Sequence, residues 1–370
     1  MAASMRDVAA LAGVSPRTVS NVVNDAPYVA AATRARVEQA MRDLGFRPNS
    51  AARSLRRGRS GLVALVVPEI GTPYFSALAA ALSEAAEERG WTLLVEQSHG
   101  DPQRERRLLD GVRDQLVDGV FFSPWGLRPQ DLRERLDPTP LVLLGEQGDT
   151  SAADHVVIDN EAAAQEATAH LLGTGRRRVA AVGATSPVGR ETVRLRRAGW
   201  AAAHAAAGID ADPALEVPVE SLHRAAGAAA VRRMADGGLR FDALFCFTDE
   251  LALGAMHALL ERGLRVPEDV ALVGFDDIED GRYATPSLTT VSPDLAAIAR
   301  EAAACLAGRL ERPRPAAPGG AGAQQDEHRT VVAPHRLMVR RSSAAGPPSP
   351  ADVGGCRDRR TPGAPAAATG

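Results

Sequence analysis

The chain has 370 residues, of which 45% are hydrophobic, so it is long enough for two or three domains and is not expected to be disordered. Its net charge of −3 is unevenly distributed, because residues 1–60 hold ten Arg and only four Asp or Glu. A basic head on an acidic body favours a polyanionic partner, although a solvated charged surface gives the same pattern. The sequence shows no signal peptide, no apolar run near the ~20 residues of a membrane span, and no cysteine pattern typical of disulfides or a metal site. We therefore expect a cytoplasmic protein.

The first 47 residues predict an all-α domain of three short helices. The stretch SMRD at residues 4–7 has the pattern of a capping box and predicts a helix to about residue 11. After a glycine turn, Ser15 followed by Pro16 predicts the start of a second helix, which runs to about residue 24. A third helix is predicted over residues 32–44. Two helices joined by a glycine-containing turn are typical of a helix-turn-helix head.

A short segment at residues 48–58 follows the head. It predicts a helix that is too short to be stable alone in water, so this helix needs a partner in order to fold. The segment therefore forms a link between the head and the rest of the chain.

From residue 61 the sequence alternates between apolar runs and Ala-rich amphipathic helices. Near-continuous apolar strands are typical of parallel sheets that are covered on both faces. About 280 residues of this pattern predict two α/β lobes, each a doubly wound parallel sheet. The strands are expected at 61–68, 91–97, 118–124, 140–145, 177–183, 242–248 and 270–276.

The C-terminal part has a different composition. Residues 311–329 form a Pro/Gly-rich loop, and residues 330–340 predict one returning strand. Residues 343–370 contain little besides Pro, Gly and Ala and are predicted to be disordered. The body is therefore expected to span residues 59–342.

Seven stretches of the chain form a further pattern: DVAALAGVSPRTVSNVVN, TRARVEQAMRDLGFRPNSAARSL, GLVALVVPEIGTPYFSAL, VVIDN, RLRRAGW, FTDELALGAM and VGFDDIEDGRYATPSLTTV. Together they resemble the LacI/GalR family of bacterial transcription regulators. The resemblance covers about residues 4–310 and resumes at 330–341. It implies a homodimer that binds an inverted repeat in double-stranded DNA, a body similar to periplasmic sugar-binding proteins, and a small-molecule effector, most simply a sugar, with no cofactor or metal.

The second helix of the head carries the candidate DNA-binding residues. A recognition helix enters the major groove by its N-terminal residues, and Arg17 can bind guanine O6 and N7 together. The resemblance places base contacts at Pro16, Arg17 and Asn21. The hydroxyl and amide residues nearby either bind phosphates, which positions the domain, or only cap helices and face solvent. By resemblance the phosphate contacts are Ser15, Thr18, Ser20, Asn24 and Tyr28.

The linking segment 48–58 matches the hinge helix of the family. In that family two hinge helices of a dimer enter the minor groove, where a leucine opens a base step. Leu55 stands at this position, with Ala52 and Arg53 beside it. Insertion of an apolar side chain between base steps is a known way of bending DNA. The alternative is that Leu55 packs on its own head.

The candidate effector-binding residues follow the strands of the body. In open α/β sheets ligands bind at the carboxyl ends of strands, where carboxylates and Arg bind sugar hydroxyls and aromatic rings cover C–H faces. Trp125 is either a further stacking face or a surface aromatic residue. Asp159 and Asp249 are expected to cap helices, whereas Asp277 either contacts the effector or caps the following turn. The resemblance and these positions point to Tyr74, Phe75, Arg196, Trp200, Thr248 and Asp276.

Three positions depart from the family pattern, because Thr72, Gly145 and Thr248 stand where relatives often have Asn, Asp and Asn. The effector of this chain can therefore differ from theirs in size or orientation. Two other functions fit the same features: a sugar-binding transport component and a regulator that needs a purine corepressor. An enzyme is not expected, because the sequence contains no G-x-S-x-G, P-loop or HExxH motif.

Overall fold

The computed structural model describes residues 3–24, 26–46, 59–111, 117–146, 152–312 and 328–344. The chain divides into two compact units, residues 1–61 and 62–370. The predicted hinge helix, including Ala52, Arg53 and Leu55, lies outside the described residues, as do most of the predicted loop and tail. None of the described helices is long and apolar enough to cross a lipid bilayer.

The first unit is the predicted helix-turn-helix head. Its helices are α1 (Met5–Ala12), α2 (Pro16–Val23) and α3 (Ala31–Asp43). The capping box at α1 is present, and the Ser15 hydroxyl accepts a hydrogen bond from the Thr18 backbone N–H at 3.1 Å, so both predicted helix starts are confirmed. Small apolar side chains form the core: Val8, Ala9, Ala12, Val19, Val22, Val37 and Ala40.

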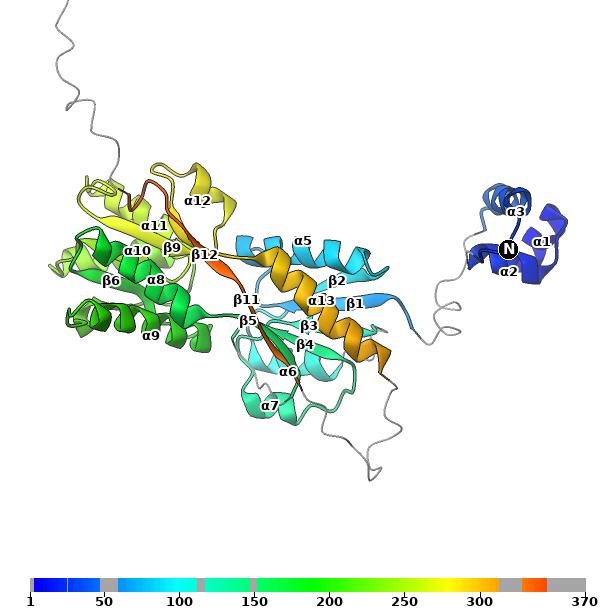
Figure 1. Ribbon diagram of the computed structural model, residues 1–370, viewed down its shortest axis with the longest axis horizontal. Coiled ribbons are helices and arrows are strands. Elements are labelled where there is room, and N and C mark those ends of the chain that lie inside the picture. Colours follow the sequence, from blue (N-terminus) through cyan, green and yellow to red (C-terminus); the bar gives the residue numbers. More distant parts are fainter. Residues whose placement is uncertain are drawn as a thin grey trace, which may run out of the picture. The chain divides into compact units, whose positions relative to one another are not determined.

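The second unit begins with a lobe built on a six-stranded parallel sheet in the order β11-β5-β4-β3-β1-β2. Helices cover both faces of this sheet (Figure 1), as the continuous apolar strands predict. The strands are β1 (Leu62–Val67), β2 (Thr92–Gln97), β3 (Gly119–Phe122), β4 (Leu141–Leu144), β5 (Asp154–Ile158) and β11 (Thr330–Ala333), and the helices are α5 (Pro73–Glu87), α6 (Pro102–Asp110), α7 (Pro129–Arg133) and α13 (Leu295–Glu311).

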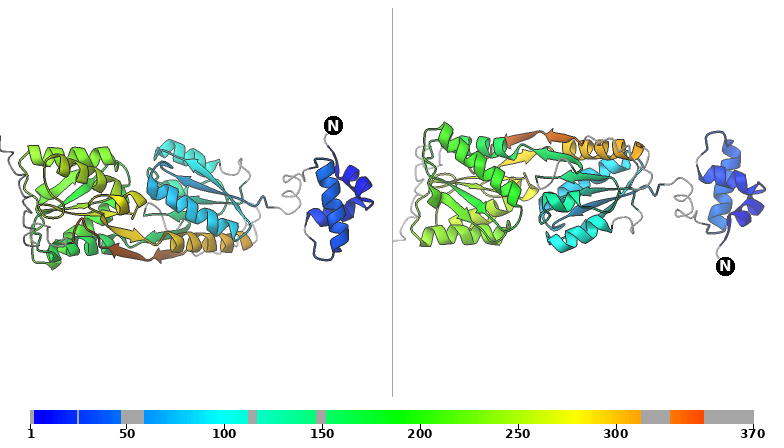
Figure 2. Two further views of the ribbon diagram at one scale, coloured as in Figure 1. Left: turned by 90° about the horizontal axis from the view of Figure 1, so that it is seen from above. Right: turned by 90° about the horizontal axis from the view of Figure 1, so that it is seen from below.

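The second lobe repeats this order with β12-β10-β9-β8-β6-β7, in which only β12 runs antiparallel to its neighbour. Figure 2 shows both sheets with their helices from two further sides. The strands are β6 (Val179–Thr185), β7 (Glu216–Pro218), β8 (Ala243–Cys246), β9 (Ala271–Phe275), β10 (Thr289–Pro293) and β12 (His335–Met338), and the helices are α8 (Asn160–Gly173), α9 (Arg190–Ala206), η2 (Pro213–Leu215), α10 (Arg224–Asp236), α11 (Asp249–Glu261) and α12 (Glu279–Tyr283).

Two glycines allow α10 and α11 to pack with their backbones in contact. A Cβ atom on Gly227 would lie 2.1 Å from the Leu251 carbonyl oxygen, and one on Gly254 would lie 1.8 Å from the Arg224 carbonyl oxygen. Both distances are far below any real carbon–oxygen contact, so these positions require glycine.

The chain passes between the two lobes three times. It crosses after β5, after β10, and between β11 and β12 at Pro334. Asp159 caps α8 and Asp294 caps α13 at the first two crossings, which confirms the prediction for Asp159. The Asp294 backbone N–H also donates to the Pro334 carbonyl at 3.0 Å, so the second and third crossings lie side by side. The continuous path of β11 and β12 across both lobes is visible in Figure 1.

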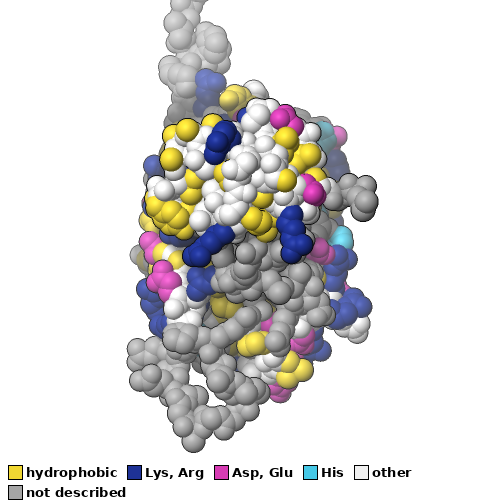
Figure 3. Space-filling model, turned by 90° about the vertical axis from the view of Figure 1, so that its right-hand side faces the viewer, with side chains coloured by type: hydrophobic (Ala, Val, Ile, Leu, Met, Phe, Trp, Pro, Cys, Tyr) yellow, Lys and Arg dark blue, Asp and Glu magenta, His cyan; other side chains and the backbone are white. Residues whose placement is uncertain are grey.

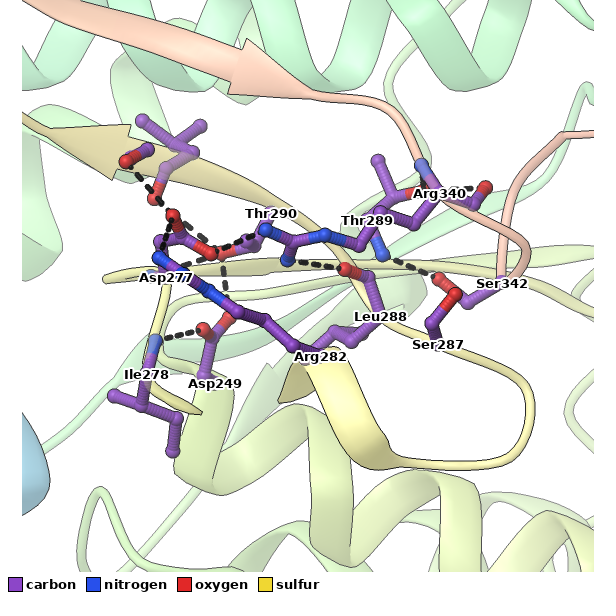
Figure 4. Close-up of polar contacts among 12 residues, drawn as sticks. Asp249, Asp277, Ile278, Arg282, Ser287, Leu288, Thr289, Thr290, Arg340 and Ser342 are labelled. Atoms are coloured by element: carbon purple, nitrogen blue, oxygen red, sulfur yellow. Dashed lines mark hydrogen bonds and ion pairs between the residues drawn. The ribbon is translucent and has the colours of Figure 1, made fainter. Parts of the chain in front are cut away.

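Three predictions about the body need correction. β5, β7 and β10 were not predicted as strands, and the single returning strand is two strands, because Pro334 has no N–H and the chain changes sheets there. The body also extends beyond 342, since Ser343 is buried and its hydroxyl bonds to His170 and Thr289. Figure 4 shows how the neighbouring Ser342 and Arg340 join this last segment to the second lobe.

Candidate functional site

A cavity lies between the two lobes of the body, at the carboxyl ends of their parallel strands. It encloses about 1030 Å³ of empty space, its open mouth included. Residues that follow β1, β3 and β4 line it from the first lobe, and residues that follow β6, β8 and β9 line it from the second. This is the position at which open α/β sheets bind ligands.

The first lobe contributes an aromatic wall. Tyr74 and Phe75 lie in the first turn of α5, with ring centroids 5.2 Å apart. Trp125 follows β3 and meets Phe75 edge to face, with centroids 5.7 Å apart. All three side chains line the cavity, as predicted for Tyr74 and Phe75, and Trp125 is not an isolated surface residue. Such a wall suits the apolar face of a ring.

The second lobe contributes a buried guanidinium. Arg196 on α9 donates from Nε to Asn160 Oδ1 at 2.7 Å and from Nη1 to the Phe247 carbonyl. Its Cζ atom lies 3.4 Å from the centroid of the Phe275 ring. Its Nη2 atom is 3.9 Å from Oδ1 of Asp276, which directly follows β9. The two strongest candidates from the sequence therefore face each other in the cavity.

Two carboxyl groups in the cavity are unusually hard to ionise. Burial raises the pKa of Asp276 to about 7, although the charge of Arg196 opposes this. Burial likewise raises the pKa of Glu146, which follows β4 of the first lobe, to about 7. Glu146 Oε1 accepts a hydrogen bond from the Asn160 side chain at 2.6 Å, so Glu146, Asn160 and Arg196 form one network across the lobes.

A second contact between the lobes lies beside the cavity. His223 of the second lobe is 2.9 Å from the Glu69 carboxylate of the first, and its other ring nitrogen is 3.9 Å from Glu250. The Thr72 hydroxyl donates to the same Glu69 oxygen at 3.2 Å. Thr72, His223 and Glu250 all line the cavity, so the pair joins the two walls where a ligand would be enclosed.

The prediction that Asp249 caps α11 is wrong. Thr248 is the N-cap, and its hydroxyl accepts from the Leu251 N–H at 3.1 Å while it lines the cavity. Asp249 is fully buried and accepts from the Thr290 hydroxyl at 2.6 Å and the Ile278 N–H at 2.9 Å (Figure 4). It thereby fixes the loop that carries Asp276, whose φ of 114° is rare for a residue with a side chain.

Asp277 also differs from expectation. It does not cap a turn by its side chain but binds Arg340 at 2.6 Å, Arg282 at 3.0 Å and the Ser292 hydroxyl at 3.0 Å (Figure 4). The loop after β9 is therefore held directly after Asp276, at Asp277 by its own side-chain contacts and at Ile278 by Asp249. A rigid loop keeps the Asp276 carboxylate aimed at the cavity.

Trp200 is a correction to the predicted site. Its side chain is completely buried in the second lobe, where Nε1 donates to the Val179 carbonyl at 3.0 Å and the ring packs on His204. It lies one helical turn after Arg196 and does not line the cavity. Trp200 is a core residue of the second lobe.

The head holds the other predicted site. Arg17 and Asn21 lie one turn apart on the same face of α2, with Arg17 and Pro16 exposed and Asn21 half-buried. Tyr28 is 76% exposed in the loop that follows. The Ser15 and Thr18 hydroxyls bond to each other at 2.9 Å, and the Asn24 amide donates to the Ser20 carbonyl at 2.7 Å. In the unbound head Ser15 therefore caps the start of α2 and Asn24 its end, while the Thr18 hydroxyl bonds to that of Ser15.

The surface of the head agrees with a polyanionic partner. Its described residues include the arginines at 6, 17, 34, 36 and 42. The face seen in Figure 3 carries separated basic and acidic side chains among hydrophobic and uncharged ones. Neutral side chains allow close approach to DNA while the arginines supply the charge.

The described parts of the chain contain no group of three His, Cys, Asp or Glu side chains that would hold a metal ion. A two-lobed ligand-binding body and a helix-turn-helix head in one chain define a class of protein, the DNA-binding regulators that respond to a small molecule. Comparison with known families agrees. Residues 4–49 match the bacterial regulatory proteins of the lacI family, and residues 168–343 match a periplasmic binding protein-like domain.

Individual relatives cover most of the chain. The ribose operon repressor of Escherichia coli K12 is 32% identical over 78% of this chain and 87% of its own length. The repressor PurR of Aliivibrio fischeri MJ11 is 31% identical over 84% and 92%. A solved complex of the regulator CelR with cellobiose is 31% identical over 92% and 99%, with a TM-score of 0.65. A lac repressor dimer bound to operator and the anti-inducer ONPF is 26% identical over 93% and 100%, with a TM-score of 0.77.

The chain belongs to the LacI family. It is a DNA-binding transcriptional repressor whose action is controlled by a small-molecule effector. The sequence alone missed Glu146, Asn160 and His223 of the cavity, and Glu69 beside it. These residues are polar and lie at the ends of strands or helices. No local sequence pattern shows that Glu69 contacts His223 or that Glu146 contacts Asn160.

Proposed function

We propose that the effector is a sugar bound between the lobes of the body, and that it changes the affinity of the head for an inverted-repeat operator. The observation that carries this proposal is the pairing of Arg196 and Asp276 opposite the aromatic wall of Tyr74, Phe75 and Trp125. Carboxylates and guanidinium groups bind vicinal hydroxyls, whereas the aromatic rings cover the C–H face of a sugar. Relatives named for ribose and cellobiose support the same ligand class.

In this proposal the head binds the major groove through Pro16, Arg17 and Asn21, and Ser15, Thr18, Ser20, Asn24 and Tyr28 contact phosphates. Ala52, Arg53 and Leu55 enter the minor groove from a hinge helix that folds on DNA. Two copies act together in the cytoplasm, since an inverted repeat requires a two-fold partner. The exposed Leu94 and Val95 on the edge strand β2 offer apolar surface to a second copy.

A sugar changes operator affinity only if it binds the two conformations of the body with different affinity. The pair Glu69–His223 and the bond between Glu146 and Asn160 span the lobes, so closure around a ligand and these contacts are coupled. A purine in place of the sugar remains the second candidate, because the aromatic wall also suits a planar base and a relative is named PurR.

The test combines ligand and DNA measurements on the full chain. Thermal melting is recorded with D-ribose, D-glucose, cellobiose, hypoxanthine and guanine, because a ligand of the folded state raises the melting temperature. A sugar that does so and changes operator affinity in a fluorescence assay supports the proposal, whereas a purine that increases operator affinity favours corepression. Leu55→Ala is expected to weaken operator binding without changing sugar affinity, and equal operator affinity would refute the minor-groove role.

A further inference from the structure

The charges that line the cavity are mainly negative. Among the described lining residues the ionisable acids are Glu146, Glu250 and Asp276, against one guanidinium, Arg196, and the imidazole of His223. Glu250 is balanced by Arg224, which binds it at 2.6 Å from outside the cavity lining. Arg196 alone therefore faces both Glu146 and Asp276.

Each nitrogen of the Arg196 guanidinium already faces an acceptor of the protein, and two of its five N–H groups are hydrogen-bonded. Its Nε is taken by Asn160, its Nη1 by the Phe247 carbonyl, and its Nη2 lies beside Asp276. A phosphate site needs a guanidinium or ammonium group whose charge is not already balanced. This guanidinium is balanced before any ligand arrives.

Helix N-termini are the other usual anion sites, and of the four helices that begin at the cavity two are closed by side-chain caps, whereas α5 and α9 have none. The Thr248 hydroxyl caps α11 and the Asp159 carboxylate caps α8. The first helical residue of α5 is Pro73, which has no N–H to donate. The helix α9 has no side-chain cap, but its first turn carries Glu191, whose charge acts on Glu146.

We propose that the cavity selects an uncharged sugar and rejects its phosphate ester. This inference rests on the proposed function and narrows its ligand class. A phosphate group at about 6 Å from an unbalanced carboxylate is repelled by its charge. At an effective dielectric constant near 20, this repulsion weakens binding roughly 100-fold for each pair of charges.

The test measures calorimetric affinities of the full chain for D-ribose against D-ribose 5-phosphate and for D-glucose against D-glucose 6-phosphate at pH 8. The free sugar of the pair that binds is expected to bind at least 100-fold more tightly than its ester. Glu146→Gln removes one charge and is expected to reduce this ratio about tenfold or more, whereas Glu161→Gln, on the exposed side of α8, leaves it unchanged.

The proposal is overturned if either ester binds as tightly as its free sugar, or if the ratio does not respond to Glu146→Gln. If neither these four compounds nor cellobiose bind while the operator is still bound, the sugar assignment itself has failed and the selectivity falls with it. Loss of operator binding in the same sample would instead count against the DNA-binding half of the proposed function.

An independent observation concerns how Trp125 is held. Glu105 on α6 is fully buried and accepts hydrogen bonds from three consecutive backbone N–H groups, at 2.9 Å from Trp125, 2.8 Å from Gly126 and 2.9 Å from Leu127. The Ser98 hydroxyl donates to the same carboxylate at 3.2 Å. A buried carboxylate is costly unless its oxygens are satisfied, and here four donors satisfy them.

The loop is also fixed by close packing. A Cβ on Gly126 would lie 2.7 Å from the Pro102 side chain, and the Trp125 ring packs on Gly100 and on Phe75. We infer that Glu105 is a positioning residue for sugar binding, which acts by holding the Trp125 ring in the aromatic wall. Glu105 itself does not line the cavity.

The test uses Glu105→Gln, which keeps the size of the side chain but leaves only one acceptor oxygen for four donors. We expect about tenfold weaker binding of the sugar that binds in the panel, unchanged operator affinity, and a smaller sugar-dependent change in tryptophan fluorescence. Trp125→Phe should abolish that fluorescence change and keep measurable sugar binding. Asp154→Asn is the matched control, since Asp154 is a buried carboxylate of the same lobe bound to Arg309 and does not line the cavity.

Equal sugar affinity and an equal fluorescence response in Glu105→Gln, even with a lower melting temperature, would reduce Glu105 to a structural residue. Equal loss of affinity in Asp154→Asn would show that general destabilisation of the lobe explains the effect. An undiminished fluorescence response in Trp125→Phe would show that the ligand does not contact this ring.

Discussion

Replacement of Asp276 by Asn tests the candidate effector site most directly. The carboxylate lies 3.9 Å from Arg196 and follows β9, where the backbone φ is 114°. Asn is the substitution of choice because Asp and Asn tolerate positive φ better than other residues with side chains, whereas Ala would add backbone strain. Size and backbone are then conserved, and only the charge is lost.

The expected magnitude follows from hydrogen-bond energies. A hydrogen bond to a charged group contributes about 1.5–3 kcal/mol, against about 0.5–1.5 kcal/mol for a neutral one. If Asp276 accepts two sugar hydroxyls, the loss is about 2–3 kcal/mol, or roughly 30- to 150-fold in the dissociation constant. The stability of the unliganded body should not fall, because burial already disfavours the charged carboxylate and raises the pKa of Asp276 to about 7.

Isothermal titration with the sugar found by thermal melting measures the affinity at pH 8, and fluorescence anisotropy measures operator binding in the same preparation. Asp236→Asn, at an exposed carboxylate on α10 whose side chain is 74% exposed, is the matched control. An unchanged sugar dissociation constant in Asp276→Asn would refute the site. Weaker operator binding without sugar would show that Asp276 acts on the conformation of the body rather than on the ligand.

Four further predictions rest on other parts of the molecule. Lowering the pH from 8 to 6 protonates Asp276 and Glu146, so the affinity for the sugar should fall. The unliganded body should become more stable over the same range, because both pKa values are raised above those of the unfolded chain. Calorimetry measures the first trend and denaturation at the two pH values measures the second. Glu69→Gln should weaken sugar binding by about two- to fivefold in the same titration, since its contact with His223 across the lobes is partly exposed, and the exposed Glu84→Gln should have no effect. Gly254→Ala should destabilise the body by at least about 2 kcal/mol in urea unfolding, because its Cβ would collide with the backbone of α10. Ser15→Ala should cost the head about 1 kcal/mol by loss of the α2 cap, and an unchanged unfolding midpoint of the head would contradict that role.

The fold could be predicted wherever burial leaves a continuous apolar run. All seven predicted strands are present because both faces of each sheet are covered. Two of the three missed strands, β5 and β10, carry polar residues that are buried by partners elsewhere in the chain. In β10, Thr289 and Thr290 are fully buried because Ser342 and Asp249 bond to them, and in β5 the buried Asp154 is bound by Arg309. No local pattern contains this information.

The candidate site could be predicted only where a residue at the end of a strand also matches the family pattern. Arg196 and Asp276 were found because residues at strand ends and the family resemblance agree, and the structure brings them together. The prediction for Trp200 is wrong because closeness in sequence to Arg196 does not show how deeply a side chain is buried. Arg196 lies at the cavity wall, whereas Trp200, one turn further along α9, lies in the core. The contacts of Glu146 and Glu69 depend on which elements of the two lobes meet, and that is set by the whole fold.

The short segment that forms β11 and β12 has a consequence for the order of folding. Because β11 pairs with β5 in one sheet and β12 pairs with β10 in the other, residues 330–338 supply an edge strand to both lobes. When synthesis has reached residue 329, neither sheet can therefore be complete. Until residues 330–338 are added, β5 and β10 both expose unpaired backbone groups. Chains that stop before residue 330 would carry two open sheet edges at once, so a premature stop codon there should yield aggregates rather than a shortened regulator.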